Sequence, residues 1–194
     1  MTLQLTKKHS FDAVYDSQKV YRLILEAMSS PGEIVNIKEY ADKLYGSYPA
    51  FLAVAMTLLD NEVSFHVCGN NPLTDEIASL ALAKWEKIEA ADFIFVCDLN
   101  YMEYAIETAK CGTLADPHKS ATVIIQNNGI SALCLTLSGP GIDGQAEVML
   151  TQAAKDAITI RDAHNYEYPQ GIDLLFISGA GELLAIPRLV RVVE

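Results

Sequence analysis

Apolar residues recur at helical spacing near the start of the chain. Between residues 11 and 30 they return at about every third or fourth position, which is typical of an amphipathic helix. Ser10 suits the N-cap position of this helix. Pro31 and Gly32 end the pattern, because proline disfavours a helical residue before it and glycine accepts turn dihedral angles. We therefore predict a helix over 11–30.

Three further segments have the pattern of helices. Residues 49–60 are apolar on nearly every side, and we expect such a helix to lie between two layers of the fold. A helix over 73–84 follows the turn Asn70-Asn71-Pro72, and another over 101–110 is ended by Gly112. Residues 145–164 are predicted to be mostly helical.

Short apolar or alternating runs predict the strands. These strands are 33–37, 62–67, 92–97, 121–126, 132–137, 173–177 and 183–186, with 190–193 extending a sheet edge. The sequence Asn127-Asn128-Gly129 is a hairpin signal, so we expect the strands on either side of it to pair. Strands alternating with helices, followed by a hairpin-rich second half, indicate an α/β fold with a mixed sheet covered by helices on both faces.

Length and composition limit the possible classes of protein. The 194 residues suit one domain, 1–194, with residues 1–10 as a flexible N-terminal segment. The net charge of −11 opposes binding to nucleic acid or to an anionic membrane surface. No apolar run reaches the roughly 20 residues that span a bilayer, and the N-terminus lacks the order of a signal peptide. We therefore expect a cytoplasmic protein with no nucleic-acid or membrane partner.

The four cysteines do not form a recognisable metal pattern. Their spacings are long and irregular, with no C-x-x-C pair, so we expect them to be small buried side chains rather than zinc ligands. The sequence also contains no H-x-x-x-H, H-x-H or H-E-x-x-H spacing and no Walker motif. Ser138 lies at a strand-to-turn corner, but the sequence places no His–Asp pair near it and has no G-x-S-x-G motif. These patterns predict neither a metal nor a cofactor.

The run Gly139-Pro140-Gly141-Ile142-Asp143-Gly144 matches G-x-G-x-x-G. A dinucleotide site is disfavoured because Pro140 removes an N–H donor and the preceding strand does not begin a βαβ unit. A tight turn without ligand is one alternative. Another is a phosphate-binding turn that uses the N–H groups of Gly141 and Ile142 at a helix start.

Charged residues elsewhere allow two interpretations each. Arg22, on the first predicted helix, and Arg188, after the last strand, suit either phosphonate binding or a salt bridge. The segment 116–120, with His118 and Lys119, is either an anion-binding group or a polar loop ahead of a strand. Asp173 begins an apolar strand, where an unpaired carboxylate is costly, so it requires a partner within the protein or in a ligand.

Short motifs follow one another in a fixed order along most of the chain. They are Gln18-x-x-Tyr21-Arg22, Ala27-Met28-Ser29-Ser30-Pro31-Gly32, Ser120-Ala121-Thr122, Ser138-Gly139-Pro140-Gly141-Ile142, Pro169-x-Gly171-Ile172-Asp173 and Ile186-Pro187-Arg188. From residue 11 to about 193 this series resembles the PhnH family, whose members belong to the bacterial carbon–phosphorus lyase core complex. Tyr21 stands where that family commonly has Phe, and His118, Lys119 and Gln170 fill positions that vary in it.

The resemblance implies a fold and a role. The fold is a three-layer α/β/α sandwich like that of pyridoxal-phosphate transferases, without the cofactor. The role is that of a supporting subunit, with core subunits G, I and J as partners and a homodimer when isolated. The complex couples an alkylphosphonate to the ribose carbon of a nucleoside triphosphate, which yields ribose 1-phosphonate 5-triphosphate.

The alternative function is a stand-alone enzyme or binding protein for a phosphorylated small molecule. It uses the turn 138–144, with Ser138, Gly139 and Gly141, and the charged groups already described. A nicotinamide oxidoreductase is a third possibility, which rests on the formal glycine pattern alone.

Overall fold

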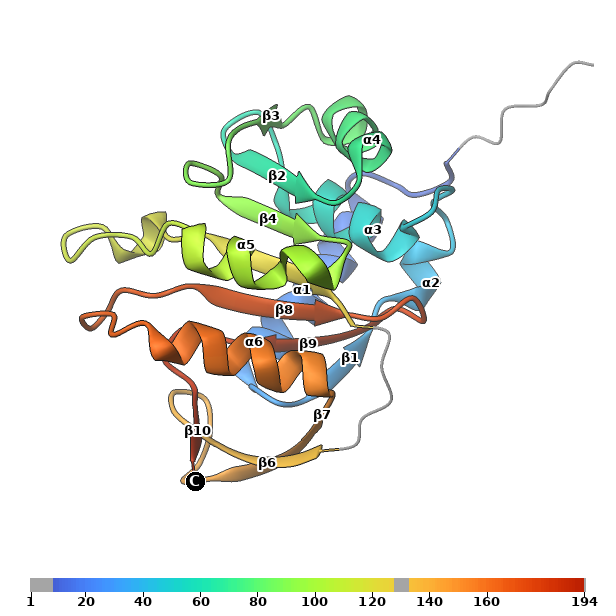
Figure 1. The fold of residues 1–194 in the computed structure, drawn as a ribbon. Coiled ribbons are helices and arrows are strands. Elements are labelled where there is room, and N and C mark those ends of the chain that lie inside the picture. Colours follow the sequence, from blue (N-terminus) through green and yellow to red (C-terminus); the bar gives the residue numbers. More distant parts are fainter. Residues whose placement is uncertain (1–8, 128–132, 194) are drawn as a thin grey trace, which may run out of the picture.

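A computed structural model describes residues 9–127 and 133–193 of the chain (Figure 1). Within these residues the main sheet has seven strands in the order β1-β9-β8-β5-β4-β2-β3. Their bounds are β1 Ile34–Asn36, β2 Ser64–Cys68, β3 Lys84–Trp85, β4 Phe93–Val96, β5 Thr122–Gln126, β8 Asp173–Ile177 and β9 Glu182–Ile186. The five strands from β8 to β3 are parallel, whereas β9 and β1 add an antiparallel edge. The predicted mixed sheet is therefore confirmed.

Helices cover both faces of this sheet. One face carries α1 (Tyr15–Ser29), α2 (Lys38–Ala41), α3 (Pro49–Leu58) and α4 (Asn71–Ala81), and the other carries α5 (Met102–Thr108) and α6 (Gln152–Ala163). Two single-turn 3-10 helices, η1 (Leu99–Tyr101) and η2 (Pro117–Lys119), lie in the connections. Along the described residues, no helix combines the length and apolar character needed to cross a bilayer.

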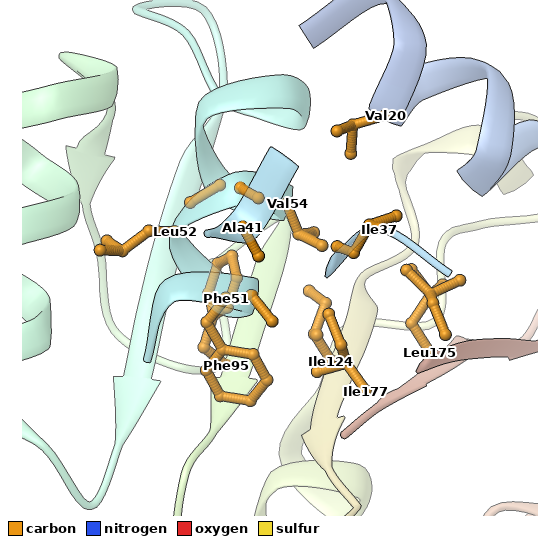
Figure 2. Packing of buried hydrophobic residues seen from close by; sticks show 14 of the residues in the cluster. Val20, Ile37, Ala41, Phe51, Leu52, Val54, Phe95, Ile124, Leu175 and Ile177 are labelled. Carbon is orange, nitrogen blue, oxygen red and sulfur yellow. The ribbon is translucent and has the colours of Figure 1, made fainter. Parts of the chain in front are cut away.

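Successive side chains of each strand point to opposite faces of the sheet, so the interior has two hydrophobic cores. In β5, Ile124 faces the core under α1 and α3, whereas Val123 and Ile125 face the core under α5 and α6. Helix α3 is buried from Ala50 to Ala55, as its all-round apolar pattern predicts. Figure 2 shows Phe51 of this helix above Phe95 of β4, where the two rings make an edge-on contact with centroids 5.7 Å apart.

A second sheet of three antiparallel strands lies beside the core under α6. Strand β6 (Leu133–Ser138) pairs with β7 (Ala146–Leu150) on one side and with β10 (Arg191–Val193) on the other. The strand predicted over 190–193 is therefore confirmed as β10, but it extends the edge of this small sheet and not of the pair β8 and β9. The prediction of a helix from residue 145 is wrong over β7, whose alternating exposed and buried side chains have the period of a strand.

The predicted hairpin between β5 and β6 is also wrong. Asn128 and Gly129 lie outside the described residues, but the strands on either side belong to different sheets. Strand β5 is held between β4 and β8, so it has no free edge to offer β6. The Asn-Gly signal describes local turn geometry only, whereas the pairing is decided by the competing parallel neighbours.

The start of α1 differs from the prediction as well. Ser10 donates to the Lys43 carbonyl and does not cap the helix, which begins at Tyr15. Asp12 Oδ1 instead accepts the N–H groups of Val14 and Tyr15, each at 2.8 Å. A carboxylate at this place also complements the positive end of the helix dipole.

Candidate functional site

Three of the sequence motifs meet where β5 and β8 begin. Thr122 and Asp173 are register partners across these strands. The backbone N–H and Nε of Arg188 donate to Oδ1 of Asp173 at 2.8 and 3.2 Å, and one terminal guanidinium nitrogen donates to Oδ2 at 2.5 Å. The other terminal nitrogen donates to the Pro117 carbonyl. Asp173 thus has the partner that its place in an apolar strand requires, and the two charges satisfy one another.

Lys119, Ser120 and Arg22 have surroundings that differ from those of this pair. Lys119 is exposed and its ammonium group lies 3.0 Å from the Asp116 carboxylate, which lowers the pKa of Asp116. Ser120 is buried, and its hydroxyl has no hydrogen-bond partner among the described residues. Arg22 lies on the exposed side of α1, where the described part of the chain gives it no ion-pair partner.

The glycine-rich turn joins two motifs that are far apart in sequence. A Cβ atom added to Gly141, at φ +86°, would lie 2.6 Å from the Ser29 carbonyl oxygen and 2.8 Å from Pro31 Cδ. Gly139, which follows Ser138 of β6, is packed as closely against Leu189 and Val190. These glycines therefore allow the turn to approach the end of α1 and the connection to β10.

The same turn lacks the features on which its nucleotide interpretations depend. It leads into strand β7 and does not open a helix. The N–H of Ile142 already donates to the Gly139 carbonyl at 3.1 Å. A dinucleotide fingerprint requires the helix that is missing here, and ligand binding by the turn stays a prediction.

The structure does not bring the seven sequence-predicted residues into one site. Asp173 and Arg188 bind each other, Ser138, Gly139 and Gly141 belong to the packed turn, and Arg22 and Lys119 are exposed on α1 and η2. The ion pair, the packed turn and the two exposed side chains are therefore separate features of the molecule. Among the described residues, no ion pair joins one of these groups to another.

A cavity that the sequence did not predict lies at the carboxyl end of β2. From β2 the chain crosses through α4 to β3, at one edge of the sheet, whereas from β4 it crosses through α5 to β5 in the opposite direction. Helices α4 and α5 cover opposite faces. Such a reversal opens a crevice outside the strand ends, where ligands bind in open α/β sheets.

We call this space the switch-point cavity. It has a volume of about 360 Å³. Its lining residues are His66, Val67, Cys68, Gly69, Asn70, Asn71, Tyr101 and Tyr104. The volume lies at the lower end of the range for small-molecule sites, which is about 300–1,000 Å³. The arrangement therefore suits a small ligand.

Close packing shapes the floor of the switch-point cavity. Gly69 has φ +85°, and a Cβ atom there would lie 2.9 Å from Asp98 Cβ and 3.3 Å from the Tyr101 ring. The Asn70 side chain accepts the N–H of Leu73 at 2.9 Å and so caps α4. Glycine is required at position 69 because its backbone lies so close to Asp98 and to the Tyr101 ring that a Cβ atom would not fit.

Two side chains of β2 give the cavity its polar character. His66 Nδ1 lies 2.9 Å from the Glu86 carbonyl, which only accepts, so this nitrogen carries a proton. Burial raises the pKa of the Cys68 thiol to about 11, so it is protonated at neutral pH. Among the described residues there is no group of three side chains suited to holding a metal ion. The cavity therefore presents a histidine and a protonated thiol from β2.

Two signals in the sequence could have indicated this cavity. Gly69-Asn70-Asn71-Pro72 directly follows a predicted strand, and Tyr101 and Tyr104 are spaced so that they share one helix face. Only the sheet order shows that these segments meet, because the reversal of crossover direction cannot be read from either segment alone.

Comparison with known proteins agrees with the motif series. A putative C-P lyase subunit protein, HtxG, of Stutzerimonas stutzeri is 26% identical over 176 residues, which are 90% of this chain and 85% of that protein. The model of the family described as bacterial phosphonate metabolism protein (PhnH) matches residues 9–193. The match spans the main sheet, the small sheet and both helical layers. This chain therefore belongs to the PhnH family of bacterial phosphonate metabolism proteins.

Proposed function

We propose that this chain is a supporting subunit of a carbon–phosphorus lyase core complex. The observation that carries the proposal is the family match from residue 9 to 193, joined by a relative named as a putative subunit of such a lyase. Its partners are core subunits G, I and J, and it pairs with itself when isolated. In the complex it supports the formation of ribose 1-phosphonate 5-triphosphate from a nucleoside triphosphate and an alkylphosphonate.

The charged groups of the motifs favour a structural role over a chemical one. Asp173 and Arg188 neutralise each other, with side chains only 9% and 20% exposed. A substrate phosphonate would have to displace a carboxylate that already occupies two guanidinium nitrogens. These motifs therefore serve mainly to hold the ends of β8 and β9 together.

The surface of α1 is suited to contact with a partner. Tyr21 and Leu25 are 51% and 54% exposed although both are apolar and lie on one helix. Between them and the sheet lies a cavity of about 240 Å³, which we call the α1 groove. It is lined by Tyr21, Ile24, Leu25, Met28, Leu58, Phe93, Thr122 and Leu175. Apolar surface of this kind marks an interaction site more often than a solvated one.

The test is co-expression of the tagged chain with subunits G, I and J, followed by gel filtration and mass determination. We expect one particle that contains all four. The Leu25→Asp variant, which places a charge in the α1 groove, should be lost from the particle. The matched control is Leu114→Asp, because Leu114 is also 54% exposed but lies in the loop before η2, and this variant should be retained.

One result would overturn the subunit role, and another would overturn only the assignment of the α1 groove as the contact surface. If the tagged chain elutes without the other subunits while they assemble, the subunit role is wrong. If the unmodified chain assembles and Leu25→Asp does so equally well, the role stands and a different face makes the contact.

A further inference from the structure

We propose that the switch-point cavity binds a small, flat, uncharged nitrogen heterocycle of nucleobase size. The proposal goes beyond the assembly role and does not depend on it, because every contact comes from this chain. It rests on the tyrosines that line the cavity, the hydrogen-bonding residues that line it with them and the distribution of charge around it.

The walls favour a flat ring. Tyr101 and Tyr104 belong to η1 and α5, line the cavity, and are 46% and 54% exposed. The Tyr101 ring lies against the backbone of Gly69, where even a Cβ atom would come within 3.3 Å of it. Half-exposed aromatic rings beside a cavity offer faces on which a heterocycle stacks.

The polar groups of the cavity suit the edge of such a ring. Because His66 Nδ1 donates to the Glu86 carbonyl, Nε2 is the ring nitrogen left to a ligand, and no hydrogen bond from a described residue reaches it. Asn70 and Asn71 also line the cavity. The Asn70 side-chain oxygen already accepts the Leu73 N–H, whereas the Asn71 amide has both a donor and an acceptor. Ring N–H groups and ring nitrogens thus both find partners.

The charges around the cavity oppose an anionic ligand. The Asp98 side chain lies beside Gly69, and the chain as a whole carries a net charge of −11. The start of α4 offers few free donors, since Pro72 has no N–H and the N–H of Leu73 is held by Asn70. A phosphate at this helix start would lack the usual backbone cradle, so the ligand is recognised through its ring.

The chain contains its own reporter for this site. Trp85 is the single tryptophan in the sequence, and its ring centroid lies 5.7 Å from that of His66. A ring bound against His66 changes the surroundings of the indole. Tryptophan fluorescence and titration calorimetry on the full-length chain therefore measure binding without a label.

The probes are adenine, adenosine and adenosine monophosphate. We expect saturable heat and a saturable fluorescence change with adenine and adenosine, and no tighter binding of the monophosphate. Tyr104→Ala should weaken adenine binding by roughly tenfold or more, the usual effect of losing one stacking ring. His66→Phe keeps a ring but removes Nε2, and it should weaken binding by roughly fivefold.

The matched control is Tyr15→Ala, since Tyr15 is 73% exposed on α1, away from the cavity, and this variant should bind adenine normally. Circular dichroism shows whether each variant is folded. The proposal is overturned if calorimetry detects no binding of adenine or adenosine, if Tyr104→Ala binds as well as the unmodified chain, or if the monophosphate binds more tightly than adenosine. If adenine does not bind and Tyr104→Ala instead prevents complex formation, the cavity receives a partner's side chain and the ligand proposal fails.

Discussion

The Asp173 carboxylate holds Arg188 through three hydrogen bonds, one of them from the Arg188 backbone. The contact fixes the connection after β9 to the first residue of β8, two positions that are 15 residues apart in sequence. Because Arg188 also donates to the Pro117 carbonyl, the same guanidinium ties η2 to both strands. Two motifs that are separate in sequence therefore form one structural unit with η2.

Replacing Arg188 with Met should destabilise the protein. It leaves the Asp173 charge, which is 9% exposed, without its ionic partner. We expect a loss of about 3 kcal/mol in the free energy of unfolding, at the lower end for a broken buried pair because Arg188 is partly exposed. Urea denaturation measures it. The control is Lys38→Met, which removes the exposed Lys38–Asp42 pair and should change stability by less than about 1 kcal/mol. Equal losses of stability in the two variants would show that the Asp173–Arg188 pair contributes no more than an exposed ion pair.

Replacing Arg161 of α6 should destabilise the protein at least as much as replacing Arg188. Its side chain is 1% exposed and donates to the carbonyl groups of Ile186, Pro187 and Val190, so it anchors the chain that leads into β10. Burial lowers the pKa of Arg161, although Asp162 opposes the change. Arg161→Met removes three hydrogen bonds from a buried guanidinium, although the Pro187 carbonyl keeps the Val190 N–H and the Val190 carbonyl keeps Arg191 as donors. The loss of these charge-assisted bonds should cost about 3 kcal/mol or more. Lys155→Met, on the exposed side of the same helix, is the control for the thermal-unfolding measurement.

The glycine-rich turn provides a matched pair of substitutions. Gly141 and Gly144 both have positive φ, but a Cβ at Gly144 would meet no atom within 4 Å. Gly144→Ala should cost about 1–2 kcal/mol from backbone strain alone. Gly141→Ala adds the clash with Ser29 and Pro31 and should cost about 2–4 kcal/mol. Chemical denaturation compares the stabilities of the two variants. Similar losses would show that the close contact with the end of α1 is not the reason why residue 141 is glycine.

The cysteines should differ in reactivity. Burial raises the pKa of Cys68 to about 11, and burial together with Cys68 raises that of Cys97 to about 12. At pH 8 only about one Cys68 thiol in a thousand is ionised, so both react slowly with a thiol reagent. The expectation that all four cysteines are buried is wrong for Cys134, which is exposed and should react first. Mass spectrometry after timed alkylation identifies the order, and fast labelling of Cys97 in the folded protein would contradict it.

Asp92 should make stability depend on pH. Burial alone raises the pKa of Asp92, but the hydrogen bonds from Lys110 and Ser64 lower it below the ordinary value of 3.8. A lowered pKa in the folded state contributes stability that is complete above the ordinary pKa and is lost as the pH falls through the lower folded value. The difference in unfolding free energy between the unmodified chain and Asp92→Asn should therefore be constant from about pH 5 to 8 and shrink below about pH 4. A difference that does not change in acid would show that Asp92 has no such role.

The sequence by itself determined the elements whose patterns are local. The apolar residues of α3 and the continuous apolar runs of β4, β5 and β8 can be recognised because a buried helix or a central parallel strand must be apolar on more than one side. The need of Asp173 for a partner also follows from its position, since burial of an unpaired carboxylate is costly. The motif series likewise identified the family.

Only the tertiary structure decided which strands pair and which polar groups meet. The Asn-Gly signal could not show that both edges of β5 are occupied. The alternating pattern of β7 covers only five residues, so it could not be distinguished from the start of the helical pattern that follows it. The switch-point cavity depends on two crossovers that leave the sheet in opposite directions, and this is a property of strand order. Local sequence fixes the torsional and burial preferences of a segment, whereas contacts between distant segments are set by competition among all of them for the same edges and faces.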